Sequence, residues 1–266
     1  MHRSLEMAVR DAYPSPGKCI YCLRKDTART IEHIVPLALN GTWIIHDAAC
    51  AECRDKTNHR YENKALNSDS LRVIRKFLRL KRRRRGNDQK EIRLPPVWSG
   101  DSANLIYAPP PLAENPLEEE FPAIFAWLDL EPARLLAAHY PPESREKIRV
   151  VFTRLDGRSV PDEPVSLRLQ IPPALFMLVA RIGYSYAVAE LSTDGFDGSE
   201  IRALLSDGGE NVFDFVGGVY GLKSNNSSHF HDLKITEVGE FVVVMVNLFS
   251  SYGIPPLEVI VGKRLK

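Results

Sequence analysis

Apolar and polar residues in the C-terminal half of the chain follow patterns that predict both helices and strands. Residues 174–191 form a long, largely apolar segment, which predicts a helix buried on most of its sides. Residues 199–206 predict a second, short helix. Because the turns between the strand-like segments are short, we expect antiparallel pairing. The predicted strands are 145–155, 165–171, NVFDFVGGVYG, HFHDLKITEV, EFVVVMVNLFS and LEVIVGKRL.

The N-terminal part predicts a strand, a turn, a second strand and then a helix. Residues 30–35 are rich in strand formers, and Asn40-Gly41 is a strong turn signal. Residues 43–45 predict a short second strand. From residue 47 to about residue 67 the apolar positions recur with helical spacing. The pattern therefore indicates a compact ββα unit.

A proline-rich stretch separates these two parts. Residues 94–122 carry seven of the nineteen prolines, which excludes a regular helix or a central strand there. We therefore expect a small basic unit at residues 1–93, an extended linker at 94–122 and a mixed domain at 123–266. The role of the last domain, in sensing, targeting or assembly, is left open by the sequence.

The charges are distributed unevenly between the two parts. The net charge is +1, but residues 1–100 hold 21 Lys or Arg against 11 Asp or Glu, whereas residues 101–266 hold 14 against 23. A basic half favours contact with a polyanion. The same asymmetry suggests a weaker idea, in which the acidic domain masks the basic one until a ligand or protein binds.

The overall composition is that of a soluble globular protein. Apolar residues make up 44% and charged residues 26% of the chain. Apolar runs such as Phe241–Val246 are short, and the first residues lack an apolar segment of the secretory kind. We therefore expect a cytoplasmic protein with no membrane partner.

The four cysteines form two Cys-x-x-Cys pairs, at Cys19/Cys22 and Cys50/Cys53. A cytosolic chain seldom keeps disulfides, and one pair alone would also suit a redox motif. Two pairs with no other cysteine in the chain favour a tetrahedral structural Zn²⁺ site instead. A unit this small needs such a metal to be stable.

Between the cysteine pairs lies Glu32-His33-Ile34-Val35-Pro36. The order CIYC (19–22), EHIVP (32–36), CAEC (50–53) and the polar helix RDKTNHRYENK (54–64) resembles the zinc-bearing subtype of the HNH endonucleases. The resemblance covers about residues 17–65. With the patterns above it implies an α+β protein: a small zinc-stapled ββα-metal domain followed by a separate mixed domain with antiparallel strands around a buried helix.

The resemblance also implies roles for individual side chains. His33 would be the general base, and Glu32 would bind a catalytic divalent ion, Mg²⁺ or Mn²⁺ in the first place, with other divalent metals open. The second ligand would come from the helix after Cys53, as Asn58 or His59. His46 would contact phosphate or position His33.

Two departures from the family pattern affect this metal shell. Arg54 stands where many members carry Asn, and the middle Asn of the family has no clear counterpart. Glu62 lies four residues after Asn58 on the same helix face, and it suits either a metal ion or an ion pair with a neighbouring Arg or Lys. A catalytically inactive copy is therefore an open alternative.

A run of basic residues follows the motif. Such a run neutralises phosphates without reading bases, so it predicts nucleic-acid binding that is independent of sequence and sensitive to salt. The residues concerned are Arg79, Lys81, Arg82, Arg83, Arg84 and Arg85.

These features together predict a metal-dependent HNH endonuclease that hydrolyses DNA, in restriction or phage defence if the resemblance extends to biological role. The alternative is a non-catalytic, zinc-ribbon-like nucleic-acid-binding protein. A homodimer, or a regulatory partner or ligand bound through residues 123–266, would suit an enzyme that cuts both strands.

Overall fold

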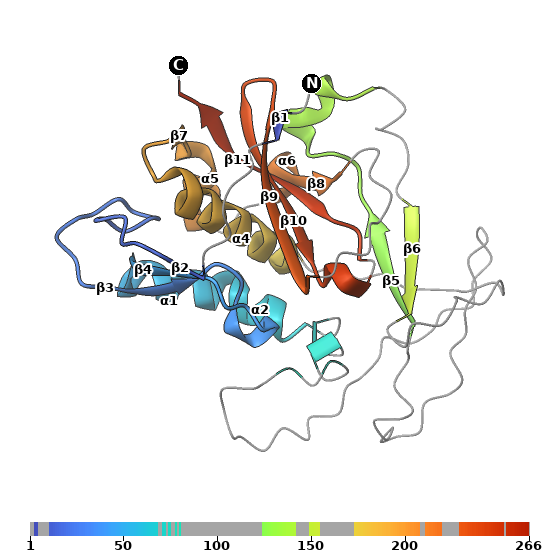
Figure 1. The fold of residues 1–266 in the computed structure, drawn as a ribbon, viewed down its shortest axis with the longest axis horizontal. Helices are drawn as coiled ribbons and strands as arrows, with labels where there is room; N and C mark the ends of the chain where they lie inside the picture. The colour runs from blue at the N-terminus through green and yellow to red at the C-terminus, as the bar shows by residue number, and fades with distance from the viewer. Residues whose placement is uncertain are drawn as a thin grey trace.

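The computed structural model describes residues 3–4, 11–68, 71–72, 74–75, 78, 80, 124–141, 149–154, 173–207, 211–219, 229–252 and 254–265. These residues form a mixed helix and strand fold, as the sequence predicts, with the cysteines near the N-terminus and an antiparallel sheet in the C-terminal part (Figure 1). The predicted linker at 94–122 and the predicted strand at 165–171 lie outside the described residues.

The N-terminal part is a three-stranded sheet followed by a helical run. The strands are ordered β2-β4-β3, with β3 and β4 antiparallel and β2 parallel to β4. The short 3-10 turn η1 (Leu37–Leu39) lies between β3 and β4. The other elements are β2 (Ala12–Tyr13), β3 (Arg29–His33), β4 (Ile44–Cys50), α1 (Ala51–Thr57), the π-helical segment η2 (Asn58–Glu62) and α2 (Asn63–Leu66).

The helical run begins four residues later than the sequence pattern predicts. Strand β4 continues to Cys50, because its last residues pair with the start of β3, where Arg29 lies opposite Cys50. The buried pair Ala48 and Ala49 belongs to this strand and produces the apolar spacing that suggests a helix. Pairing with a neighbouring strand therefore overrides the local pattern.

The C-terminal sheet has the strand order β1-β9-β10-β11-β7, with β8 paired to β11, and every pairing in it is antiparallel. The predicted strands at its centre are confirmed as β9 (His231–Val238), β10 (Phe241–Leu248) and β11 (Leu257–Arg264). The outer strands are β1 (Arg3–Ser4), β7 (Phe196–Asp197) and β8 (Val216–Gly218).

The remaining elements surround this sheet. The segment NVFDFVGGVYG, predicted as one strand, begins instead as a helical turn, α6, before β8. Strands β5 and β6 form a separate antiparallel pair. The bounds are β5 (Ile124–Asp129), η4 (Arg134–His139), β6 (Arg149–Arg154), α5 (Ser199–Asp207), α6 (Val212–Phe215) and η6 (Ser250–Tyr252).

Helix α4 (Pro173–Leu191) is the central element of the fold, and it matches the predicted buried helix. It lies between the C-terminal sheet and the N-terminal helical run, and it contacts β10 and β11 on one side and η2 and α2 on the other (Figure 1). By length and composition it could cross a membrane, unlike the short runs noted above, but 72% of its most apolar window is buried inside the fold. Burial by the protein's own sheet explains the apolar sequence of this helix.

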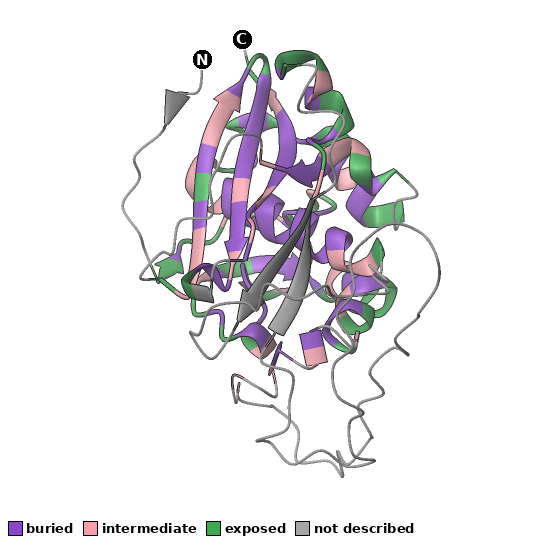
Figure 2. Cartoon of the chain, turned by 90° about the vertical axis from the view of Figure 1, so that its right-hand side faces the viewer, coloured by how far each residue is buried: buried purple, intermediate pink, exposed green. Residues whose placement is uncertain are grey.

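One hydrophobic cluster runs through both parts of the chain. It includes Ile20 and Ile45 from the N-terminal part, Leu178 and Ile182 from α4, and Val244 from the sheet. Figure 2 shows the buried positions concentrated along the sheet and the helix in the middle of the molecule. Apolar burial is the main stabilising contribution in such a core, so the two parts stabilise each other.

Polar contacts reinforce this packing. The imidazole Nε2 of His231 lies 2.8 Å from the carbonyl oxygen of Leu39, and its Nδ1 accepts a hydrogen bond from the Phe249 N–H at 3.3 Å. The contact between His231 and Leu39 attaches the turn after the EHIVP motif to strand β9. A second polar contact, the ion pair between Lys18 and Asp194 at 2.6 Å, joins the first cysteine turn to the residues after α4.

The turn between β3 and β4 leaves no room for a larger residue. Asn40 has a left-handed backbone, with φ of 65°. A Cβ added at Gly41 would lie 2.0 Å from the carbonyl oxygen of Val35. Glycine is required here because the backbone itself is in the way.

We expect Gly41→Ala to lower the free energy of unfolding by about 1–3 kcal/mol, because relief of the clash must move the Val35 backbone. Urea unfolding measures the effect. Thr42→Ala, at the exposed neighbouring position, is the control and should change stability by less than about 0.5 kcal/mol. Equal stability of the two variants would contradict the tight turn.

His231 predicts a pH dependence of stability. Burial lowers its pKa from 6.5 to about 4, and the hydrogen bond to Leu39 opposes this only in part. The unfolded chain therefore binds the additional proton first, and the free energy of unfolding falls as the pH drops from 6.5 toward 4. We expect a loss of about 3 kcal/mol across this window that His231→Gln removes. Urea unfolding at several pH values, with exposed His229→Gln as control, measures it; identical slopes in wild type and His231→Gln would refute the assignment.

Candidate functional site

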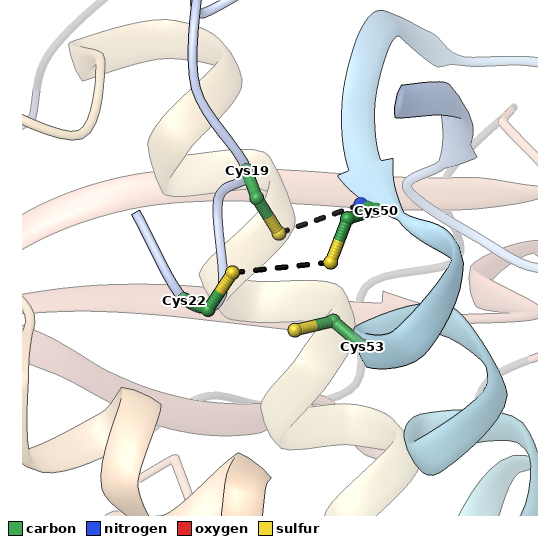
Figure 3. Close-up of side chains that lie close together, drawn as sticks. All are labelled: Cys19, Cys22, Cys50 and Cys53. Carbon is green, nitrogen blue, oxygen red and sulfur yellow. Dashed lines mark hydrogen bonds between the residues drawn. The ribbon is translucent and has the colours of Figure 1, made fainter. Parts of the chain in front are cut away.

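The four cysteines converge at one point, as their spacing predicts. Cys19 and Cys22 belong to the turn before β3, Cys50 ends β4, and Cys53 lies in the first turn of α1 (Figure 3). Their sulfur atoms all lie within 4.8 Å of one another, and the distance between Cys22 Sγ and Cys50 Sγ is 3.8 Å. Cys19 and Cys50 are buried.

This spacing fits a tetrahedral Zn²⁺ site. With Zn–S bonds of about 2.3 Å, the sulfurs of such a site lie about 3.8 Å apart. The Cys50 N–H also donates to Cys19 Sγ at 3.5 Å, and Leu23 takes a left-handed backbone, φ 61°, to close the first turn. Four thiolates this close repel one another unless a cation lies between them. The four residues can therefore hold one Zn²⁺ in a structural role.

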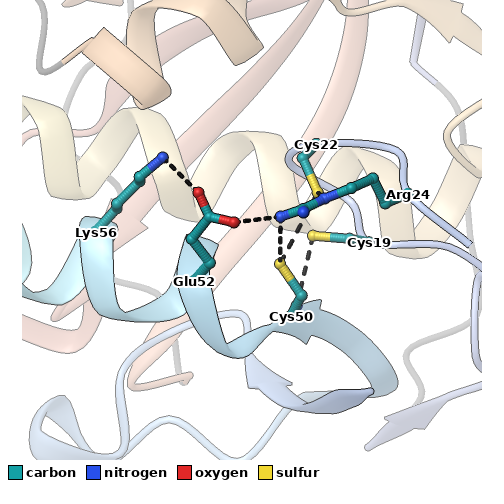
Figure 4. A network of polar contacts seen from close by, with 6 residues as sticks. All are labelled: Cys19, Cys22, Arg24, Cys50, Glu52 and Lys56. Carbon is teal, nitrogen blue, oxygen red and sulfur yellow. Dashed lines mark hydrogen bonds and ion pairs between the residues drawn. The ribbon is translucent and has the colours of Figure 1, made fainter. Parts of the chain in front are cut away.

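Arg24 borders the sulfur cluster and adds positive charge (Figure 4). Its Nε donates to Cys22 Sγ at 3.3 Å, and its Nη2 lies 3.8 Å from Cys50 Sγ. The same guanidinium binds Glu52, which also pairs with Lys56 at 2.8 Å. Burial alone would raise the pKa of the Cys22 thiol, but the hydrogen bonds from Arg24 outweigh it and lower this pKa to about 6. Arg24 thus favours the thiolate that a metal requires.

Glu32 and His33 project from opposite faces of β3, because neighbouring strand residues alternate. Glu32 lies opposite Ile45 and faces the core, where it is 4% exposed. His33 lies opposite Ile44 on the other face and is half-buried. His46 is exposed, and the pairing of β4 with β3 becomes irregular directly after Ile45. The strand therefore separates Glu32 and His33 onto opposite faces.

The carboxylate of Glu32 is held by two polar partners. Tyr21 donates its hydroxyl to Glu32 Oε1 at 2.7 Å, and Nη2 of Arg181 forms an ion pair with the same oxygen. Arg181 comes from α4, and its other terminal nitrogen lies 3.2 Å from Glu62 Oε2. The Nη2 group also donates to the carbonyl oxygen of His33 at 3.0 Å.

A catalytic divalent ion does not fit at Glu32 in this arrangement. The carboxylate is buried, and its Oε1 accepts hydrogen bonds from both Arg181 and Tyr21. Asn58 is not a polar partner of Glu32 among the described residues. Among the described residues, the four cysteines are the one group of three or more His, Cys, Asp or Glu side chains close enough together to hold a metal ion. The metal-ligand roles of Glu32 and Asn58 stay predictions.

The other predicted residues lie on the helical run or beyond it. Asn58 is half-buried and His59 is exposed, both in η2. A π-helical turn of this kind is rare and often occurs at functional sites. The predicted phosphate-binding residues lie outside the described part of the chain: Arg79, Lys81, Arg82, Arg83, Arg84 and Arg85.

A role for Arg181 at this site was not predicted from the sequence, although this arginine has an unusual position in the chain. It is the one Lys or Arg in the nineteen residues of α4 and lies among apolar neighbours. A charge buried in such a helix needs a partner of opposite sign. The identity of that partner, 149 residues earlier in the chain, is visible only in the fold.

Comparison with known proteins identifies one segment. Residues 19–70 match the family model of the HNH endonucleases, so the resemblance of this segment is confirmed. The match takes in both cysteine pairs, the Glu32-His33 strand and the helical run through η2, which together make up about a fifth of the chain. No curated protein and no solved structure matches the chain.

We expect the purified chain to contain one Zn²⁺, and Arg24→Met to weaken its retention by about tenfold or more, as loss of an outer contact to metal ligands does. Competition with a chromogenic chelator measures the affinity. Lys56→Met is the matched control, because Lys56 binds the same Glu52 but makes no hydrogen bond to the sulfurs drawn in Figure 4. Equal retention in the two variants would contradict the role of Arg24.

Proposed function

We propose that residues 19–70 form the catalytic unit of an endonuclease that hydrolyses phosphodiester bonds in DNA. The observation that carries the proposal is the coincidence of the HNH family match with a four-cysteine cluster that anchors the strand bearing Glu32-His33. The family implies a nucleic-acid substrate. DNA rather than RNA, and a role in restriction or phage defence, belong to the proposal.

His33 is the proposed general base. It lies on the face of β3 opposite Glu32 and is half-buried, and a neutral imidazole there would accept a proton from the water that attacks phosphorus. The exposed His46 stays a proposed contact to the phosphate. Zn²⁺ bound by the four cysteines would hold the hairpin against α1 without entering the reaction.

The second requirement of the reaction is stabilisation of the negative charge that develops on the phosphate. A divalent ion such as Mg²⁺ or Mn²⁺ would stabilise that charge when bound. Because Glu32 is paired with Arg181, no step is assigned to an ion at Glu32. Asn58 and His59 stay proposed contacts from the helical run, and the basic residues at 79–85 stay proposed contacts to the DNA backbone.

The ion pair of Glu32 also favours a second candidate function, a zinc-stapled nucleic-acid-binding protein without catalysis. A nuclease motif whose acidic residue is buried against an arginine is what an inactive copy would look like. Such a protein would bind DNA in a salt-dependent way. It would not cleave DNA, whichever divalent metal is supplied. A regulatory partner or a homodimer formed through residues 123–266 is compatible with either function.

Plasmid cleavage decides between these functions. We expect the wild type to nick supercoiled DNA with at least one of Mg²⁺, Mn²⁺, Ni²⁺ and Zn²⁺. His33→Ala should lower the rate by about 10²- to 10⁴-fold, because the loss of a general base costs that much. His229→Ala is the control, an exposed histidine on the sheet side, and should cleave like the wild type.

Circular dichroism and zinc content establish that His33→Ala is folded. Cleavage by the wild type that persists unchanged in folded His33→Ala would refute His33 as the base. No cleavage with any of the four metals, together with salt-dependent DNA binding, would support the non-catalytic alternative.

A further inference from the structure

Arg181 is a buried cation in the middle of an apolar helix. Its side chain is 5% exposed, and it is the single Lys or Arg within α4. A buried guanidinium stays only where anions compensate it. The two anions here are Glu32 and Glu62, which come from strand β3 and from segment η2.

These two carboxylates have the origins that the family resemblance gives to metal ligands. Glu32 is the first residue of the EHIVP motif and directly precedes His33 on β3. Glu62 lies on the helical run after the second cysteine pair. Both approach one guanidinium, Glu32 at Nη2 and Glu62 at Nη1 with a distance of 3.2 Å. A single positive group from α4 therefore lies where a shared divalent ion would need to be.

The surroundings supply hydrogen-bond donors rather than metal ligands. Tyr21 donates its hydroxyl to Glu32 at 2.7 Å. The Tyr61 hydroxyl and the Nε and Nη1 of Arg181 are buried and have no hydrogen-bond partner among the described residues, so Nη1 meets Glu62 as an ion pair without an aligned hydrogen bond. A hard divalent ion needs six or more oxygen lone pairs, and its waters would face these unused donors. The pocket is thus built to bind carboxylates with protein N–H and O–H groups.

We infer that Arg181 is the resident counter-cation of the Glu32–Glu62 pair, and that the folded chain binds no divalent ion through these two carboxylates. The inference rests on the proposed function for its consequence: a divalent ion used in cleavage has its ligands elsewhere, toward the face that carries His33. The guanidinium lies between Glu32 Oε1 and Glu62 Oε2, and its positive charge, which is covalently part of the fold, repels a second cation at this pair.

Mn²⁺ binding to the zinc-loaded full chain tests the inference without reference to cleavage. The signal of free Mn²⁺ in electron paramagnetic resonance gives the bound fraction. Glu62→Gln and Glu32→Gln should each bind Mn²⁺ within twofold of the wild type. A tenfold or greater loss of affinity in either folded variant would overturn the inference.

Removal of the guanidinium supplies the reverse experiment. Arg181→Met keeps the apolar stem but removes the positive charge, so the two carboxylates lose their counter-cation and the variant should gain one Mn²⁺ per chain. Adding Glu62→Gln to Arg181→Met should weaken that new site by at least tenfold. Arg202→Met, the same exchange on α5, is the matched control and should gain none. A folded Arg181→Met that binds no more Mn²⁺ than the wild type would contradict exclusion by Arg181.

The variants are scored for folding by zinc content and circular dichroism. If Arg181→Met does not fold, the comparison of the wild type with Glu62→Gln, whose side chain is 16% exposed, still decides the question. Cleavage that depends on His33 together with Mn²⁺ binding that depends on Glu62 would refute the inference and leave the proposed function standing. Absence of cleavage with unchanged Mn²⁺ binding would do the reverse.

Discussion

Four sulfur atoms placed so that they can share one cation are the constraint on which the N-terminal part depends. They bring the turn before β3, the end of β4 and the start of α1 to one point at the open end of the β3–β4 hairpin. The face of β3 that carries His33 is thereby fixed relative to the helical run. Arg24 offsets the negative charge that four thiolates leave on the cluster.

Helix α4 supplies the second constraint, because it is the core of both parts of the chain. Its apolar side chains pack against β10 and β11, while Arg181 reaches into the motif between β3 and η2. The β3–β4 hairpin therefore does not complete its own core. A residue from the C-terminal part neutralises the acidic residue of the motif and holds the backbone carbonyl of His33.

Local chemistry allowed much of this to be predicted. The cysteine spacing located the metal cluster, the order of motifs identified the nuclease segment, and strand-like segments joined by short turns located β9, β10 and β11. The start of α1 and the helical turn α6 were missed because strand pairing and packing override local pattern at those points. The partner of Glu32 was missed because no local pattern links residues 149 positions apart.

That separation has a consequence for the newly made chain. A ribosome adds roughly 5–20 residues per second, so Glu32 leaves the tunnel many seconds before Arg181 exists to meet it. During this interval the nascent polypeptide contains Glu32 and both cysteine pairs but not the guanidinium that pairs with Glu32 in the folded chain. Translation order thus requires α4 to be made before the charge of this buried carboxylate can be compensated by Arg181.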